Sequence, residues 1–288
     1  MKIVFLGGGR ITTAMLAGLR LAGCRHHLAV HDPHPRKLKR IKKEFAVTTE
    51  PSLAGAVAHA DLLVVAVRPE SVHDLLLDLQ KAIPLNFKRG CSMLAVSLAA
   101  GVTLAALRHV SGKRVVWARA MPSPVCRTGN GLTALTFDRK MPSISRDQIR
   151  RVFASVGTVL EVPESQFDAF TVNYSSSHGY HALAALAEAA VANGLDRRIA
   201  LLSAAHALAD GIIAWRKGKI PLDRLLREAA TPGGVAETTM AAMNRRGYQH
   251  AVDAGFRAGL ARMRANASLG RQRTKNSGRR GGPGAMES

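Results

Sequence analysis

The sequence has few of the residues that build disulfide or metal frameworks. Its 288 residues include three cysteines, Cys24, Cys91 and Cys126, and neither their odd number nor their spacing fits a disulfide set or a metal site. We therefore expect small buried thiols in a reduced, cytoplasmic protein that holds no metal. Lys2 and the strand predicted after it belong to the fold, so we expect no signal peptide.

Long uncharged apolar stretches are also missing. Hydrophobic residues make up 47% of the chain, which is enough for a sizeable core, but no stretch combines the length and the lack of charge that a bilayer span requires. The length allows one large domain or two of ordinary size. We predict a protein with no membrane partner.

Acidic residues are scarce, and this scarcity leaves a net charge of +21. Basic residues gather in positions 36–43 and again after Arg271, where glycine and proline replace apolar residues. The first cluster either attracts phosphorylated or nucleic-acid partners or is a solvated helix face. The lack of an aromatic platform or a recognised motif argues against nucleic acid. The composition predicts a disordered basic tail over residues 269–288.

The strongest motif lies in the first 32 residues. Residues 2–6 are an apolar run typical of a buried strand, and Gly7, Gly8 and Gly9 end it. Apolar residues then recur at helical spacing, and a second apolar run leads to Asp32. A strand, a glycine turn, a helix, a strand and an acid form the unit that binds a dinucleotide. In this unit the first glycine makes the tight turn, and Gly9 lets a pyrophosphate approach the backbone at the helix start.

Two positions leave the details of this motif open. Thr12 replaces the third glycine and either loosens the helix–strand packing or adds a hydroxyl. Asp32 stands where an acid commonly holds the ribose hydroxyls, which favours NAD. Arg36 and Lys37, however, would neutralise a 2′-phosphate, so these residues alone do not decide between NAD and NADP.

Strand and helix patterns alternate as far as residue 162. The apolar run 61–67 is nearly continuous, as in a strand that is buried on both faces. This alternation predicts an α/β fold with a doubly wound parallel sheet, a Rossmann domain over residues 1–163. The predicted strands are 2–6, 28–30, 61–67, 93–96, 113–118, 132–137 and 158–162, and residues 119–124 are expected to form a loop.

From residue 164 onward the pattern is helical and rich in alanine. The helices are interrupted at residues 175–180 and 231–234. So many apolar helical faces predict an all-α dimerisation domain over residues 164–268, in a homodimer or a larger homo-oligomer. The predicted helices are 167–172, 181–193, 197–215, 222–227, 236–246 and 249–267.

Five short segments together resemble the pyrroline-5-carboxylate reductase family. They are Gly7-Gly8-Gly9, Ala66-Val67-Arg68-Pro69, Ser97-Leu98-Ala99-Ala100-Gly101, Arg119-Ala120-Met121-Pro122 and Thr231-Pro232-Gly233-Gly234. The resemblance covers roughly residues 1–267. It implies a Rossmann domain, a helical dimerisation domain and a nicotinamide cofactor, usually NADPH. It also implies hydride transfer to a cyclic imine, which converts pyrroline-5-carboxylate to proline.

The chain departs from the family pattern in the two segments that the resemblance assigns to the substrate. In the first, the family's glycines are Ser175 and Ser177 and its proline is His178. In the second, the family's two threonines are Val235 and Ala236. The resemblance therefore implies reduction of a small cyclic imine carboxylate, with a different imine as an open alternative.

The resemblance also implies a set of site residues. The expected cofactor contacts are Gly7, Gly8, Gly9, Arg10, Ile11, Thr12, Asp32, Ala66, Val67, Arg68, Pro69, Ser97, Ala99 and Met121. The expected substrate contacts are Ser175, Ser177, Tyr180, Glu228, Gly233, Gly234, Val235 and Ala236, and the expected catalytic side chains are His178, Ser176 and Thr231.

Two alternatives remain open at this point. His178 either donates a proton to the imine nitrogen or is a loop histidine held by local hydrogen bonds. The altered substrate segments also fit a family member that binds the cofactor, has lost catalysis and serves a regulatory role. A 3-hydroxyacid dehydrogenase is disfavoured, because that class uses a lysine after the domain boundary and no lysine lies between Lys140 and Lys217.

Overall fold

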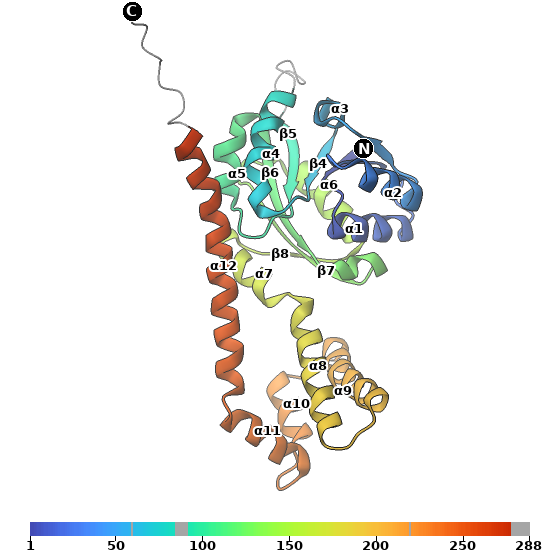
Figure 1. Cartoon of the computed structure of the whole chain (residues 1–288), viewed down its shortest axis with the longest axis vertical. Helices are drawn as coiled ribbons and strands as arrows, with labels where there is room; N and C mark the ends of the chain where they lie inside the picture. The colour runs from blue at the N-terminus through green and yellow to red at the C-terminus, as the bar shows by residue number, and fades with distance from the viewer. Residues whose placement is uncertain (59, 84–91, 219, 278–288) are drawn as a thin grey trace, which may run out of the picture. The chain divides into compact units, whose positions relative to one another are not determined.

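The computed structural model describes residues 1–58, 60–83, 92–218 and 220–277, which leaves Cys91 outside the described residues. The chain forms two compact units. The first comprises Met1–Asn173 together with the chain from Gly259 onward, and the second comprises Tyr174–Ala258. Figure 1 shows a sheet flanked by helices for the first unit and helices alone for the second.

The first unit is built on an eight-stranded sheet with the strand order β3-β2-β1-β4-β5-β6-β7-β8. Neighbouring strands are parallel except β6 and β7, which pair antiparallel. The order reverses between β1 and β4, which is where doubly wound sheets bind ligands. The strands are β1 (Lys2–Leu6), β2 (His27–His31), β3 (Thr48–Glu50), β4 (Leu62–Val65), β5 (Met93–Ser97), β6 (Val115–Pro122), β7 (Gly131–Phe137) and β8 (Gly157–Glu161).

Side chains of each central strand alternate between two hydrophobic cores. Ile3 and Phe5 of β1 belong to one core, and Val4 and Leu6 belong to the other. The first core is completed by α1 (Arg10–Leu21), α2 (Pro35–Phe45) and α6 (Ser143–Ala154). The second is completed by α3 (Leu53–Ala58), α4 (Pro69–Ala82) and α5 (Leu104–Ser111). The α/β doubly wound fold predicted from the sequence is therefore confirmed.

Two strands differ from the sequence prediction. β3 was not predicted, because its three residues at the sheet edge are too few for a periodic pattern. β6 continues through Pro122, although residues 119–124 were predicted to be a loop. The reason is the antiparallel partner β7, which pairs with Ala118 through Pro122 and so continues the strand past Arg119, the last residue that pairs with β5.

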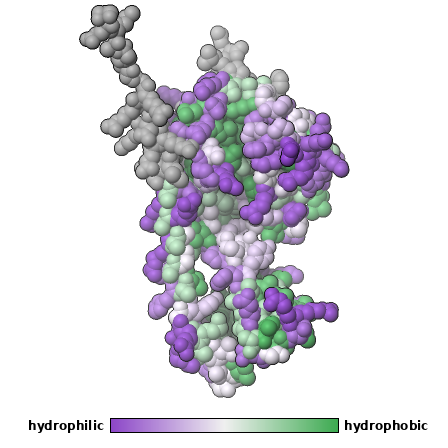
Figure 2. Space-filling model, in the orientation of Figure 1, coloured by the Kyte–Doolittle hydropathy of each residue, from purple (hydrophilic) through white to green (hydrophobic). Residues whose placement is uncertain are grey.

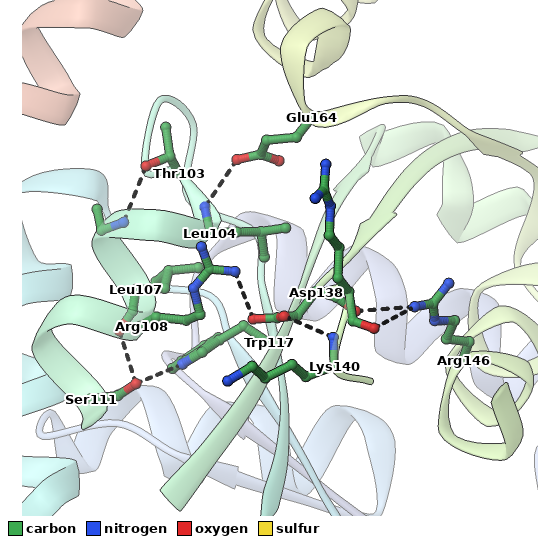
Figure 3. A network of polar contacts seen from close by, with 12 residues as sticks. Thr103, Leu104, Leu107, Arg108, Ser111, Trp117, Asp138, Lys140, Arg146 and Glu164 are labelled. Carbon is green, nitrogen blue, oxygen red and sulfur yellow. Dashed lines mark hydrogen bonds and ion pairs between the residues drawn. The ribbon is translucent and has the colours of Figure 1, made fainter. Parts of the chain in front are cut away.

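A network of polar contacts ties α5 to the beginning of β6 and to the residues after β7 (Figure 3). Arg108 donates to the Asp138 carboxylate at 2.9 Å, and the Trp117 indole donates to the Ser111 hydroxyl at 2.7 Å. Arg146 of α6 donates to backbone carbonyls, including that of Asp138 at 3.2 Å. These contacts lie at the amino-terminal end of β6, away from the carboxyl ends of the parallel strands.

The first compact unit extends one helix beyond Pro163, where the sequence analysis places the start of the helical domain. α7 (Glu164–Asn173) belongs to this unit. Phe167 of α7 is fully buried with Ala134 and Val162, and Arg119 stacks 4.3 Å from the centre of its ring. This packing on the sheet, which the change of composition at residue 164 does not reveal, fixes α7 to the first unit.

The second unit consists of α8 (Ser176–Ala192), α9 (Arg197–Lys217), α10 (Leu222–Ala229), α11 (Val235–Arg245) and the beginning of α12 (Tyr248–Ser277). Within it, α8 and α9 bury a small core of Ala187, Ala200 and Ala204. α8 begins at Ser176, so residues 176–180 form its first turn and are not an interruption as predicted.

α9 is long and apolar enough to cross a membrane by length and composition alone. The expectation that no stretch meets these criteria is wrong for this helix, which is the single such helix among the described residues. The core helix of a soluble protein passes the same test.

α12 contributes to both units and is longer than predicted. It continues to Ser277, so residues 269–277 are helical where a disordered tail was expected, and 278–288 lie outside the described residues. From Gly259 onward it belongs to the first unit. There Met263 is buried and the Asn266 amide donates to the Ala100 carbonyl at 3.3 Å.

Candidate functional site

The carboxyl ends of the central strands are held together just after the strands stop. The Gly7 N–H donates to the His31 carbonyl at 2.7 Å, and the Ala66 N–H donates to the Leu6 carbonyl at 2.8 Å. The Leu98 N–H donates to the Val65 carbonyl at 2.9 Å. The residues after β1, β4 and β5 therefore lie along one edge of the sheet, as predicted for a dinucleotide site.

Gly7 and Gly9 lack a side chain for different physical reasons. Gly7 has φ of +111°, and a Cβ there would lie 2.9 Å from the Ala66 carbonyl oxygen. Gly9 has ordinary φ, and a Cβ there would meet only that same oxygen, at 4.0 Å. Gly7 is thus required by the fold, whereas the space beside Gly9 is open for a phosphate group. The turn fits a pyrophosphate.

The start of α1 adds hydrogen-bond donors to this open space. Gly9 is its N-cap, no side chain caps the helix, and its first turn contains no acidic residue. Arg10 is exposed in that turn. The Thr12 hydroxyl is buried and donates to the Gly7 carbonyl at 2.6 Å, so Thr12 adds a hydroxyl that braces the turn. An uncapped helix start with a cationic first residue attracts an anion.

Asp32 is buried beneath the same turn, with 5% of its side chain exposed. One carboxylate oxygen accepts from the Gly8 N–H at 2.8 Å and from Lys37 at 3.3 Å. The other accepts from the His34 N–H and from the His34 ring, both at 2.9 Å. Burial alone would raise the pKa of Asp32, but the hydrogen bonds from Gly8 and His34 and the charge of Lys37 hold it below its ordinary value.

Other predicted cofactor residues line the ends of β4, β5 and β6. Arg68 is the N-cap of α4 and extends into solvent, with Ala66, Val67 and Pro69 beside it. Ser97 and Ala99 are buried, and the Ser97 hydroxyl accepts from the Ala99 N–H at 3.3 Å. Met121 lies on β6 and packs against the cluster around Phe167. The contacts of all these residues with a cofactor remain predictions.

An ion-pair network beside β6 was not found by sequence reasoning. Arg119, with 1% of its side chain exposed, donates to Glu164 at 3.0 Å and to Asp168 at 2.8 Å. Glu164 also accepts from the Leu104 N–H at 2.9 Å, which gives a hydrogen-bond partner to the first backbone N–H of α5. The network therefore braces α7 and the loop before α5. Its signal in the sequence is weak, because the three charges are far apart along the chain.

The predicted substrate residues of the second unit occupy two helix starts. The Ser175 hydroxyl caps α8 and lies 2.7 Å from that of Ser177. His178 is in the first turn of α8, where its N–H donates to the Ser175 carbonyl at 3.1 Å. Ser176 lies in the same turn, and Tyr180 is exposed. The structure brings these residues together on one turn, and their roles remain predictions.

The second substrate segment forms the turn before α11. The Gly234 N–H donates to the Thr231 carbonyl at 2.9 Å, and Gly233 has φ of +72°. The Gly233 N–H donates to the Glu237 carboxylate at 2.6 Å, a contact that sequence reasoning missed. Val235 and Ala236 are exposed at the helix start.

Glu228, a predicted substrate contact, is engaged elsewhere. Its carboxylate accepts from Arg224 one turn earlier on α10, at 2.7 Å.

Over the part of the chain that the structure describes, no group of three or more histidine, cysteine or acidic side chains forms a metal site. Cys126 is buried, and this burial raises the pKa of its thiol to about 11.

Comparison with known proteins agrees with this arrangement. A family model described as pyrroline-5-carboxylate reductase dimerisation matches residues 164–266, and one described as NADP oxidoreductase coenzyme F420-dependent matches residues 2–84. The pyrroline-5-carboxylate reductase of Mycobacterium tuberculosis is 30% identical over 281 residues, which cover 91% of this chain and 95% of the relative. The chain belongs to the pyrroline-5-carboxylate reductase family. The resemblance seen in the sequence is thereby confirmed.

Other family members extend this comparison. The reductase of Mycobacterium leprae is 31% identical over 278 residues, with 89% of this chain and 94% of the relative covered. Among solved structures, the NADP-bound pyrroline carboxylate reductase of Plasmodium falciparum matches with a TM-score of 0.81 at 20% identity, covering 93% of this chain and 98% of its own. The Streptococcus pyogenes enzyme also has a TM-score of 0.81, at 23% identity, with coverages of 92% and 98%. These structures share the fold.

Proposed function

We propose that this protein reduces pyrroline-5-carboxylate to proline with NADPH or NADH. The observation that carries the proposal is the match to reductases of this name along almost the whole chain. The glycine turn supports it, since Gly9 leaves room for a pyrophosphate at an uncapped helix start.

In this reaction the chain mainly binds and orients. When bound, a nicotinamide cofactor would supply the hydride for the carbon of the protonated C=N bond, and the products would be a secondary amine and the oxidised cofactor. A protonated imine is already electrophilic, so positioning contributes much of the rate. Backbone N–H groups at the start of α1 would hold the pyrophosphate, and Arg10 would add a positive charge.

On the substrate side, the proposal assigns the carboxylate and the ring nitrogen to the two helix starts of the second unit. The hydroxyls of Ser176 and Thr231 and the backbone at Gly234 offer hydrogen-bonding groups to the carboxylate. His178 is proposed to deliver the proton that converts the ring nitrogen of the neutral imine to the protonated C=N group before hydride transfer. Glu237 must release the Gly233 N–H if that group is to bind the carboxylate.

We also propose that the protein is a cytoplasmic homo-oligomer. The match to a dimerisation family over residues 164–266 supports this assembly. The buried core of the second unit is small, and its helices expose large apolar side chains, among them Ile199, Leu202 and Ile213 of α9. Figure 2 shows green, hydrophobic surface over this unit. Covering such a surface stabilises an assembly at about 25 cal/mol per Å² of apolar area.

The test is a hydride-transfer assay with the purified full chain. Oxidation of NADPH and NADH is followed with pyrroline-5-carboxylate, a piperideine carboxylate and a cyclic imine without a carboxylate. We expect turnover with pyrroline-5-carboxylate and the least turnover with the imine that has no carboxylate. Tight cofactor binding without reduction of any imine would overturn the enzymatic proposal and favour a regulatory role.

His178→Gln tests the assignment of the proton. We expect kcat to fall about a hundredfold with cofactor affinity unchanged, because a side chain that transfers a proton contributes on this order. His250→Gln, on α12, is the matched control. Equal activity of the His178 variant and the unmodified protein would show that His178 has only a structural role at the start of α8.

A further inference from the structure

The last helix of the chain packs beside the loop that follows β5, residues 98–103. α12 belongs to the first unit from Gly259 onward, and in this part Met263 is buried. The Asn266 amide donates to the Ala100 carbonyl at 3.3 Å, across a separation of 166 residues. The part of α12 from Gly259 to Asn266, named here the docked segment, therefore holds one carbonyl of the loop after β5.

The loop and the docked segment approach each other closely. Gly101 has φ of +80°, and a Cβ there would lie 2.5 Å from the Met263 carbonyl oxygen and 3.0 Å from the Asn266 side chain. A residue with a side chain would not fit between the two backbones. At the other end of the docked segment, a Cβ at Gly259 would lie 2.7 Å from Val172 of α7. The segment is thus packed against both the loop and α7.

Two backbone hydrogen bonds hold the loop at its ends. The Leu98 N–H donates to the Val65 carbonyl at 2.9 Å, where the chain leaves β5. The Leu104 N–H donates to Glu164 at 2.9 Å, where the chain enters α5. The bond from Asn266 acts on the carbonyl of a residue between these two points. It therefore restrains the middle of the loop.

The position of this loop on the sheet relates it to one end of the proposed cofactor. The space beside Gly9 stands where the strand order reverses between β1 and β4. A dinucleotide bound at such a point places one nucleotide over each half of the sheet. The half with β2, where Asp32 lies, takes the adenosine in folds of this class. The loop after β5 lies in the other half, which takes the nicotinamide.

We propose that the docked segment of α12 positions the loop after β5 for the nicotinamide end of the cofactor, with Asn266 as the positioning residue. The proposal rests on the proposed function and adds to it a residue from the end of the chain. Hydride transfer requires the two reacting carbons to be aligned, and a misplacement of about 1 Å can slow a reaction about a hundredfold. A loop that a helix already holds in place costs less to order when the cofactor binds.

The test compares the two ends of the cofactor in the intact protein. Asn266→Asp replaces the amide donor with an acceptor of nearly the same shape. We expect it to weaken the binding of NADPH and NADH about tenfold and to leave the binding of ADP-ribose, which lacks the nicotinamide, unchanged. Calorimetry measures these dissociation constants. The rate of hydride transfer to pyrroline-5-carboxylate at saturating cofactor should also fall about tenfold.

A second measurement needs neither cofactor nor turnover. Hydrogen exchange of the backbone amides in residues 98–104 is followed by mass spectrometry in the protein without cofactor. Exchange in Asn266→Asp should be about tenfold faster than in the unmodified protein, because the loop opens more readily. Gly101→Ala should have the same effect by another route, since its Cβ would push the docked segment away.

Asn193→Asp is the matched control. The Asn193 amide also donates to a backbone carbonyl, that of Ala189 at 2.8 Å, but it lies at the end of α8 in the second unit. We expect this variant to change none of the measurements.

An unchanged exchange rate of the loop in Asn266→Asp would overturn the proposal, and so would an equal loss of affinity for ADP-ribose and for the dinucleotides. If the unmodified protein binds the cofactor but reduces no imine, the proposed function fails by itself. The loop exchange and the comparison of ADP-ribose with the dinucleotides still decide the role of Asn266 in that case.

Discussion

At the scale of single residues, Gly7 and Gly9 in the turn after β1 lack a side chain for different physical reasons. The conformation of Gly7 is one that residues with a side chain rarely adopt, and the Ala66 carbonyl leaves no room for a Cβ. Gly9 has neither constraint within the protein. Because the two requirements are separate, substitution can separate stability from binding.

Gly9→Ala should preserve folding and weaken NADPH binding by about tenfold or more, since its methyl group enters the space proposed for the pyrophosphate. Gly7→Ala should lower the free energy of unfolding by about 1–3 kcal/mol, because a strained backbone and a close contact act together. Chemical denaturation and cofactor titration of both variants measure the two effects. Unchanged cofactor affinity in Gly9→Ala would contradict the placement of the phosphates.

At the scale of elements, a second buried acid, Asp138, stabilises the end of the sheet that lies opposite the proposed cofactor site. Asp138 follows β7 and binds Arg108 of α5 and the Lys140 N–H (Figure 3). Burial alone would raise its pKa, but these hydrogen bonds and the charges of Arg108 and Lys140 hold it below the ordinary value of 3.8. Asp138 therefore stabilises the folded state above this value, and the contribution is lost as the pH falls through its lowered pKa.

Asp138→Asn should lower the free energy of unfolding at neutral pH by about 1–3 kcal/mol, because hydrogen bonds to a charged, buried group are lost. It should also flatten the loss of stability on acidification. Urea unfolding from neutral pH to below the carboxyl range measures both. Asp78→Asn, which alters an exposed ion pair on α4, should change stability by less than about 0.5 kcal/mol. The same pH dependence in the Asp138 variant and the unmodified protein would refute this role.

At the scale of the whole molecule, the two units differ in how completely they bury their apolar residues. The sheet of the first unit is covered on both faces. The second unit buries little beyond the alanines between α8 and α9, and it exposes isoleucine, leucine and tryptophan side chains along α9. A surface of this kind requires a partner to exclude water, which is the physical basis for the proposed homo-oligomer.

Ile213→Arg should convert the proposed homo-oligomer to a monomer, since it places a charge on the exposed apolar face of α9. Ile144→Arg is the matched control, because Ile144 is an exposed isoleucine on α6 in the first unit. Light scattering coupled to gel filtration distinguishes the two states. A monomeric unmodified protein, or an oligomer that survives the Ile213 substitution, would exclude this face as the interface.

Local sequence patterns predicted most of the fold because the features concerned are short-range. The run 61–67 predicted β4, and the glycines after residue 6 predicted the turn into α1. Patterns did not reveal contacts between residues that are distant in sequence. β6 is extended by pairing with β7, and α7 is held to the sheet by Arg119, which pairs with Asp168 at a separation of 49 residues.

The sequence by itself determined the fold class and the position of the glycine turn, because strand alternation, helical periodicity and glycine spacing are properties of neighbouring residues. Five short segments of the sequence carried the resemblance to the family. Only the tertiary structure decided what the acid after β2 does. In the sequence, Asp32 predicts an acceptor for ribose hydroxyls, with Arg36 and Lys37 as a competing signal. In the folded chain its carboxylate oxygens accept hydrogen bonds from Gly8, His34 and Lys37, because folding brings the turn, the end of β2 and the start of α2 together.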